Sequence, residues 1–133
     1  MNTQVEFRSE RFPPYPGEEV EINPGLWGKR LAEFLVAGLN QYGFATREPI
    51  AEDWGWMVPI ENDAFPLWIG CANYEEHPDG FLCFVEPSKP FIRRFFKKIP
   101  TEPRVLAVTK ALASLLSSEP SIRDIHWWTE PDE

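Results

Sequence analysis

The sequence predicts an α+β protein in which two long helices pack against an antiparallel sheet. Apolar residues recur with a helical period over 25–42 and again over 102–118. Between these stretches the period changes to that of a strand, and turn-forming residues such as His77-Pro78-Asp79-Gly80 separate the runs. With 133 residues, 43% of them hydrophobic, the chain fits a single domain over 1–133 with one core.

The N-terminal part holds two short alternating runs around the proline-rich turn at 12–17. Because proline cannot donate a ladder hydrogen bond, we expect an N-terminal arm or a short edge hairpin over 1–22. The first long helix follows over 25–42, with Asn23 as its expected cap. Gly38 lies inside this helix, which predicts the close approach of another backbone at that point.

A three-stranded antiparallel meander is predicted over 54–61, 65–73 and 81–86. A turn at Asn62-Asp63 would connect the first two strands and set Ile60 opposite Phe65. One face should then belong to the core, since it gathers the apolar residues Trp54, Trp56, Val58, Ile60, Phe65, Leu67, Ile69 and Cys71.

The second face of this sheet is less polar than a solvated face requires. Its expected residues include Met57, Pro59, Pro66, Trp68, Gly70, Ala72 and Phe84. Either the N-terminal arm and the segment 89–98 fold over this face, or the face is a homodimer interface or a groove for a partner.

Charge is distributed unevenly along the chain. The segment 89–98 carries five basic residues and no acidic one, while the rest of the chain holds 8 basic and 21 acidic residues, a balance of −13. Helical spacing of Ile92, Phe95, Phe96 and Ile99 predicts a short amphipathic helix over 91–99. The second long helix over 102–118 and a final strand over 122–128 complete the predicted fold.

Several classes of protein are disfavoured. A net charge of −8 argues against nucleic-acid binding by the whole surface. The chain has no apolar run long enough for a transmembrane span, and its start lacks the features of a signal peptide, so we expect a cytoplasmic protein. Cys71 and Cys83 are expected to be buried thiols in a reducing compartment.

No catalytic motif is recognisable, so an enzyme is the less favoured hypothesis. The residues able to bind a soft metal are Cys71, Cys83, His77 and His126, but their spacing matches no familiar zinc site. We therefore predict no catalytic residue, no metal site and no cofactor.

The favoured function is a non-catalytic protein-interaction module of the immunity-protein, adaptor or chaperone type, in which acidic loops favour a basic partner. The candidate partner-binding residues are Met57, Trp68, Phe84, Glu52, Asp53, Glu75 and Glu76. A second candidate is a basic, aromatic contact for an acidic partner, RNA or an anionic membrane, made by Arg93, Arg94, Lys97 and Lys98. In its order of elements, size and acidity, the chain broadly resembles small secretion chaperones and some toxin-immunity proteins.

The alternative function is a small-ligand binding domain or an enzyme. Its pocket would lie between the first long helix and the meander, lined by Trp27, Trp54 and Trp56. Because paired tryptophans more often fill cores than hold ligands, we rank this hypothesis second.

Overall fold

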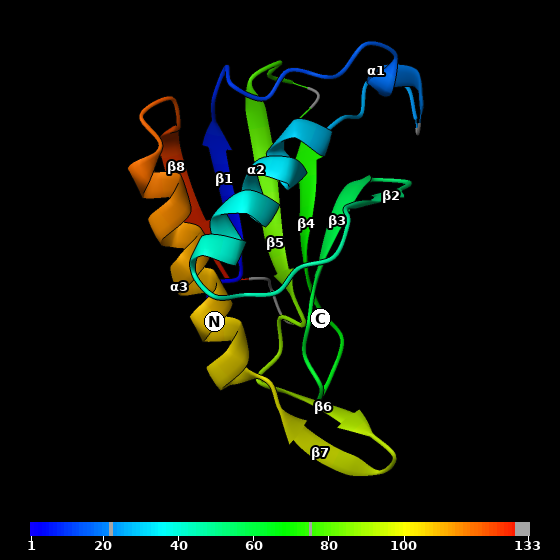
Figure 1. Cartoon of the computed structure of the whole chain (residues 1–133), viewed down its shortest axis with the longest axis vertical. Coiled ribbons are helices and arrows are strands. Elements are labelled where there is room, and N and C mark those ends of the chain that lie inside the picture. Colours follow the sequence, from blue (N-terminus) through cyan, green and yellow to red (C-terminus); the bar gives the residue numbers. More distant parts are fainter. Residues whose placement is uncertain (22, 75, 130–133) are drawn as a thin grey trace.

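The computed structural model describes residues 1–21, 23–74 and 76–129, and its main sheet contains six antiparallel strands (Figure 1). These strands are β1 (Gln4–Arg8), β2 (Ile50–Glu52), β3 (Gly55–Ile60), β4 (Leu67–Asn73), β5 (Gly80–Glu86) and β8 (Arg123–Trp128). Across the sheet they follow the order β2-β3-β4-β5-β1-β8. The helices are α1 (Glu18–Glu21), α2 (Lys29–Gln41) and α3 (Glu102–Ser118). The predicted α+β class is confirmed.

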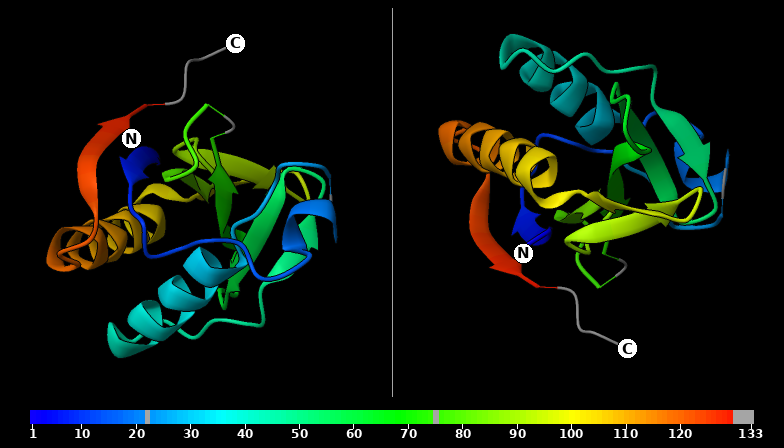
Figure 2. Two further views of the ribbon diagram at one scale, coloured as in Figure 1. Left: turned by 90° about the horizontal axis from the view of Figure 1, so that it is seen from above. Right: turned by 90° about the horizontal axis from the view of Figure 1, so that it is seen from below.

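Both long helices cover the same face of the sheet (Figure 2). The core lies between the helices and this face, where apolar side chains alternate along each strand and recur at helical spacing along α2 and α3. Its fully buried members include Val5, Val58, Ile69, Val85, Leu31, Leu35, Leu39, Val105, Val108, Leu112 and Leu116. Among the described residues, no helix is long and apolar enough to cross a bilayer.

The first strand does not lie where the sequence suggested. β1 is an interior strand, paired antiparallel with β5 on one side and with β8 on the other. The expectation of an arm or an edge hairpin is therefore wrong for Gln4–Arg8. The strand contains no proline, so each of its residues can donate a ladder hydrogen bond, as an interior strand requires. Val5 and Phe7 point into the core.

The pairing of β3 with β4 differs from the predicted register by two residues. Ile60 lies opposite Leu67, and Phe65 belongs to the connecting loop, where it is buried. The Asn62 side chain closes this wider loop by donating a 3.0 Å hydrogen bond to the Phe65 carbonyl. A shift of two keeps each remaining paired residue on its face, so the pattern of apolar residues alone could not distinguish the two registers.

The predicted helix over 91–99 is wrong. This segment is a β-hairpin of β6 (Phe91–Arg94) and β7 (Lys97–Pro100), which forms a separate two-stranded sheet at one end of the molecule (Figure 1). Ile92 pairs with Ile99, and both pack against the core.

The helix α2 begins at Lys29, later than the predicted residue 25, and Asn23 does not cap it. The Asn23 amide instead donates to the Asp53 carbonyl at 2.6 Å. A Cβ placed on Gly38 would lie 2.3 Å from Leu115 Cδ2, so the close neighbour of Gly38 is a side chain of α3 rather than a backbone.

Candidate functional site

Neither long helix lies over the second face of the six-stranded sheet (Figure 2). We call this surface the open face. The strand register places on it Met57, Pro59, Trp68, Gly70, Ala72, Leu82, Phe84, Gln4, Glu6, His126 and Trp128. Most of these side chains are partly buried against one another and partly accessible to solvent.

Three aromatic rings form a cluster on the open face. Trp54 stacks on Trp68 with 5.9 Å between ring centroids, and Phe84 lies 5.1 Å from Trp54 and 5.6 Å from Trp68. The ring of Phe84 lies directly over Gly70, where a Cβ would come within 2.2 Å of Phe84 Cζ. Glycine at this position therefore provides the space that lets the three rings meet.

The structure brings together three of the residues predicted to bind a partner. Met57 and Phe84 are both register partners of Gly70, on opposite sides of it, and Trp68 packs against Phe84. The sequence had assigned Trp54 to the core face. The alternation breaks at Gly55, whose φ of 153° belongs to the region that favours glycine, and Trp54 joins the open face instead.

The three tryptophans of the predicted ligand pocket do not line one cavity together. Trp27 borders a hollow with Phe12 and Pro78, whereas Trp56 borders a different hollow between α2 and the loop that precedes β2. Trp54 lies on the open face, on the side of the sheet opposite Trp56.

A cavity of about 240 Å³ lies beside the open face, between β1, the β4–β5 loop and the start of β8. Its lining includes Glu6, Tyr74, Glu76, His77 and Asp124. The Tyr74 hydroxyl donates to the Glu6 carboxylate at 2.5 Å, and burial together with this bond raises the pKa of Tyr74. We call this space the acidic cavity, because three carboxylates border it together with one guanidinium, that of Arg8.

Asp79 holds one end of this region together. Its carboxylate accepts hydrogen bonds from Arg8 at 2.8 and 3.0 Å and from Arg123 at 2.5 Å. These bonds tie the β4–β5 loop to β1 and β8. The Arg8 guanidinium keeps the pKa of Asp79 below its usual value, and Arg123 acts in the same direction.

The turn between β2 and β3, which carries two of the predicted acidic residues, lies toward the same end of the sheet as the β4–β5 loop (Figure 1). Glu52 ends β2, and Asp53 follows it in the exposed turn to β3. Glu76 lines the cavity, while Glu75 lies outside the described residues. Glu6, Tyr74 and Asp124 were not predicted, because they come from three segments far apart in the chain and leave no local motif.

The four candidate ligands for a soft metal are divided between two environments. Cys71 and Cys83 face each other on β4 and β5, and both are buried in the core. Burial, together with the neighbouring thiol, raises the pKa of Cys71. His77 lines the acidic cavity, and His126 stacks on Trp128 at 5.8 Å. Within the described ranges, no group of three or more metal-binding side chains is close enough to hold an ion.

The four predicted basic residues all lie on the β6–β7 hairpin, at the other end of the molecule from the acidic cavity (Figure 1). Arg93, Lys97 and Lys98 are exposed, whereas Arg94 is partly buried and donates to the Ala64 carbonyl at 2.9 Å. The molecule therefore presents two separate candidate surfaces of opposite charge. No family model, curated protein or solved structure matches this chain.

Proposed function

We propose that this chain is a non-catalytic protein-interaction module that binds its partner on the open face. One observation carries the proposal: the cluster of Trp54, Trp68 and Phe84 is well packed but remains partly accessible on a face that neither long helix covers. Clustered aromatic residues dominate the binding energy of many protein interfaces, because they bury a large area with little loss of conformational freedom.

The acidic cavity beside the cluster indicates the chemistry of the partner. Glu6, Glu76 and Asp124 border a space of about 240 Å³, and Arg8, the guanidinium in its lining, is already paired with Asp79, so the space suits a lysine or arginine side chain. Glu52 and Asp53 add negative charge at the same end of the sheet and would speed association with a basic surface. We therefore infer a basic protein partner that places an apolar patch on the aromatic cluster and a cationic side chain in the cavity.

Site-specific crosslinking in the native host tests this proposal. A photoreactive phenylalanine analogue in place of Trp68 should yield one discrete adduct with another protein. The matched control carries the same analogue in place of Tyr42, which is 50% exposed at the end of α2. Adducts at position 42 but not at 68, or the same adducts at both positions, would contradict the proposal.

The homodimer alternative is tested by light scattering on the purified chain. A dimer that Trp68→Glu converts to a monomer would identify a second copy as the occupant of the open face. If the wild-type chain is monomeric and the Trp68→Glu variant folds normally, the partner on the open face is a different protein. Aggregation or unfolding of this variant would instead show that Trp68 stabilises the fold itself.

A further inference from the structure

The β6–β7 hairpin projects from the end of the molecule farthest from the acidic cavity (Figure 1). Its base is fixed, because Ile92 and Ile99 pair with each other and pack against the core. The hydrogen bond from Arg94 to the Ala64 carbonyl attaches it to the β3–β4 loop. These contacts hold the tip away from the body of the protein.

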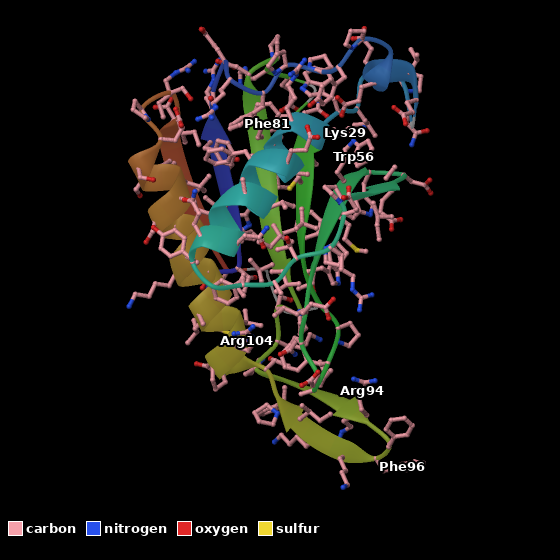
Figure 3. The ribbon with its side chains drawn as sticks, in the orientation of Figure 1. Lys29, Trp56, Phe81, Arg94, Phe96 and Arg104 are labelled. Atoms are coloured by element: carbon pink, nitrogen blue, oxygen red, sulfur yellow. The ribbon has the colours of Figure 1, made fainter. Side chains whose placement is uncertain are left out.

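Two phenylalanines occupy the tip, in an unusual backbone conformation. Phe95 and Phe96 have φ angles of 51° and 65°, in the left-handed region that bulky residues rarely adopt. Two-residue hairpin turns of this kind favour Asn-Gly, so this pair of residues costs folding energy. Their side chains are also 87% and 102% exposed, and Figure 3 shows Phe96 pointing away from the hairpin. Neither the fold nor the turn explains two phenylalanines here, which points to a contact outside the chain.

Basic side chains lie immediately behind the aromatic tip. Arg93, Lys97 and Lys98 are exposed, and Lys98 Nζ lies 3.6 Å from the centroid of Phe91, which is itself 47% exposed. The hairpin and its flank carry five positive charges, whereas the rest of the chain has a balance of −13. This asymmetry would turn the hairpin end toward an anionic surface.

We propose that the hairpin tip docks reversibly on an anionic lipid surface. Phe95 and Phe96 would enter the boundary between headgroups and acyl chains, while Arg93, Lys97 and Lys98 would contact lipid phosphates. The apolar tip would reach the deeper acyl boundary while the cations behind it stay level with the phosphates, so the order of groups along the hairpin matches the layers of a bilayer. A nucleic acid is the weaker candidate, because a strand extending past the tip would run along an acidic body.

This contact does not depend on the proposed partner-binding face. The hairpin lies beyond one end of the six-stranded sheet (Figure 1). When the hairpin is docked on a lipid surface, the open face of the protein would therefore remain in water. A protein that uses both surfaces would hold its partner at a membrane. Each surface can be tested with the other left intact.

Cosedimentation with lipid vesicles tests the proposal. The wild-type chain should pellet with vesicles of phosphatidylcholine mixed with phosphatidylserine, but not with vesicles of phosphatidylcholine alone. The double variant Phe95→Asn/Phe96→Gly keeps every cation and supplies the preferred turn residues. Its partitioning should fall by at least about tenfold, because two apolar side chains are lost from the contact. Thermal melting should show equal or higher stability, which separates lost binding from lost folding.

Two controls and one competing ligand sharpen the test. Tyr42→Asn removes an exposed aromatic side chain outside the hairpin and should leave partitioning unchanged. Lys97→Glu should weaken binding strongly, whereas Lys110→Glu on α3 should weaken it much less. The proposal fails if the wild-type protein does not bind the anionic vesicles, or if the Phe95→Asn/Phe96→Gly variant binds them as well as the wild type does. Phenylalanine-dependent binding of labelled single-stranded RNA, without vesicle binding, would assign the hairpin to nucleic acid instead.

Discussion

The buried carboxylate of Glu18 accepts a 2.9 Å hydrogen bond from the backbone N–H of Gly28, the residue that precedes α2. It accepts a second, also of 2.9 Å, from the N–H of Lys29. The first N–H groups of a helix lack partners within the helix, and the helix dipole makes this end positive. A side chain from α1 therefore caps α2 and fixes the path of the chain between them.

Replacing Glu18 by Ala should lower the free energy of unfolding by about 2 kcal/mol, because the backbone N–H groups of Tyr15, Gly28 and Lys29 all lose their acceptor. Urea denaturation measures this loss. Glu19→Ala, an exposed change in the same short helix, should stay within about 0.5 kcal/mol of the wild type. Equal midpoints for the two variants would show that the cap is dispensable.

Gly55→Ala should be more damaging than Gly43→Ala, although both glycines have positive φ. A Cβ on Gly55 would lie 2.4 Å from the Cys71 carbonyl oxygen in β4, whereas a Cβ on Gly43 meets nothing within 4 Å. We expect losses of about 3 kcal/mol or more for Gly55 and about 1–2 kcal/mol for Gly43. Chemical denaturation of both variants checks the order, and the reverse order would refute the steric explanation.

Stability should fall in acid, in part through Asp79. Because the pKa of Asp79 is lower in the folded protein than the value of about 3.9 in an unfolded chain, its carboxylate stabilises the fold above about pH 4. This contribution is lost as the pH falls through the folded pKa. Asp79→Asn should therefore melt at a lower temperature than wild type near pH 7, with the gap closing in acid. The exposed Asp63→Asn variant is the control, and a gap that does not change with pH would contradict the assignment.

Cys71 and Cys83 should resist thiol reagents in the folded protein. Both are fully buried, and the raised pKa of Cys71 disfavours the thiolate that reacts. A colorimetric thiol assay should detect neither cysteine under native conditions and both after unfolding in denaturant. Rapid reaction of either cysteine in the native state would show that the β4–β5 region opens more readily than its burial implies.

The sequence predicted the fold class because most apolar residues follow one period within each element. Val58 and Val85 alternate with less buried neighbours, and Leu31 and Leu35 recur at helical spacing. These patterns identify the type of element but not its partners. The position of β1 between β5 and β8 depends on pairing across most of the chain, which no local pattern records.

The hairpin over 91–99 shows how a short pattern misleads. Ile92 and Ile99 are seven positions apart, which fits two turns of a helix, and the same residues are also a cross-strand pair in a hairpin with a two-residue turn. The usual turn signal was missing, because Phe95-Phe96 stands where Asn-Gly or a similar pair is expected. A helix was therefore the natural interpretation.

The candidate site was predictable only where it follows one sheet face. Met57, Trp68 and Phe84 could be placed together because the meander repeats every second residue on one side. Trp54 was misplaced, since the backbone at Gly55 reverses the alternation. The pairing of Tyr74 with Glu6 joins residues 68 positions apart, so only the folded chain reveals the acidic cavity.

The interior position of β1 also constrains the order in which the chain can fold. β1 is the strand that joins β8 to the rest of the main sheet, and β8 lies at its edge. Because β1 precedes β5 in the chain, β1 must wait for β5 to be synthesised, and β8 can join the main sheet only after β1 is in place. Such long-range pairing slows folding, and a change that displaces β1 would release two strands rather than one.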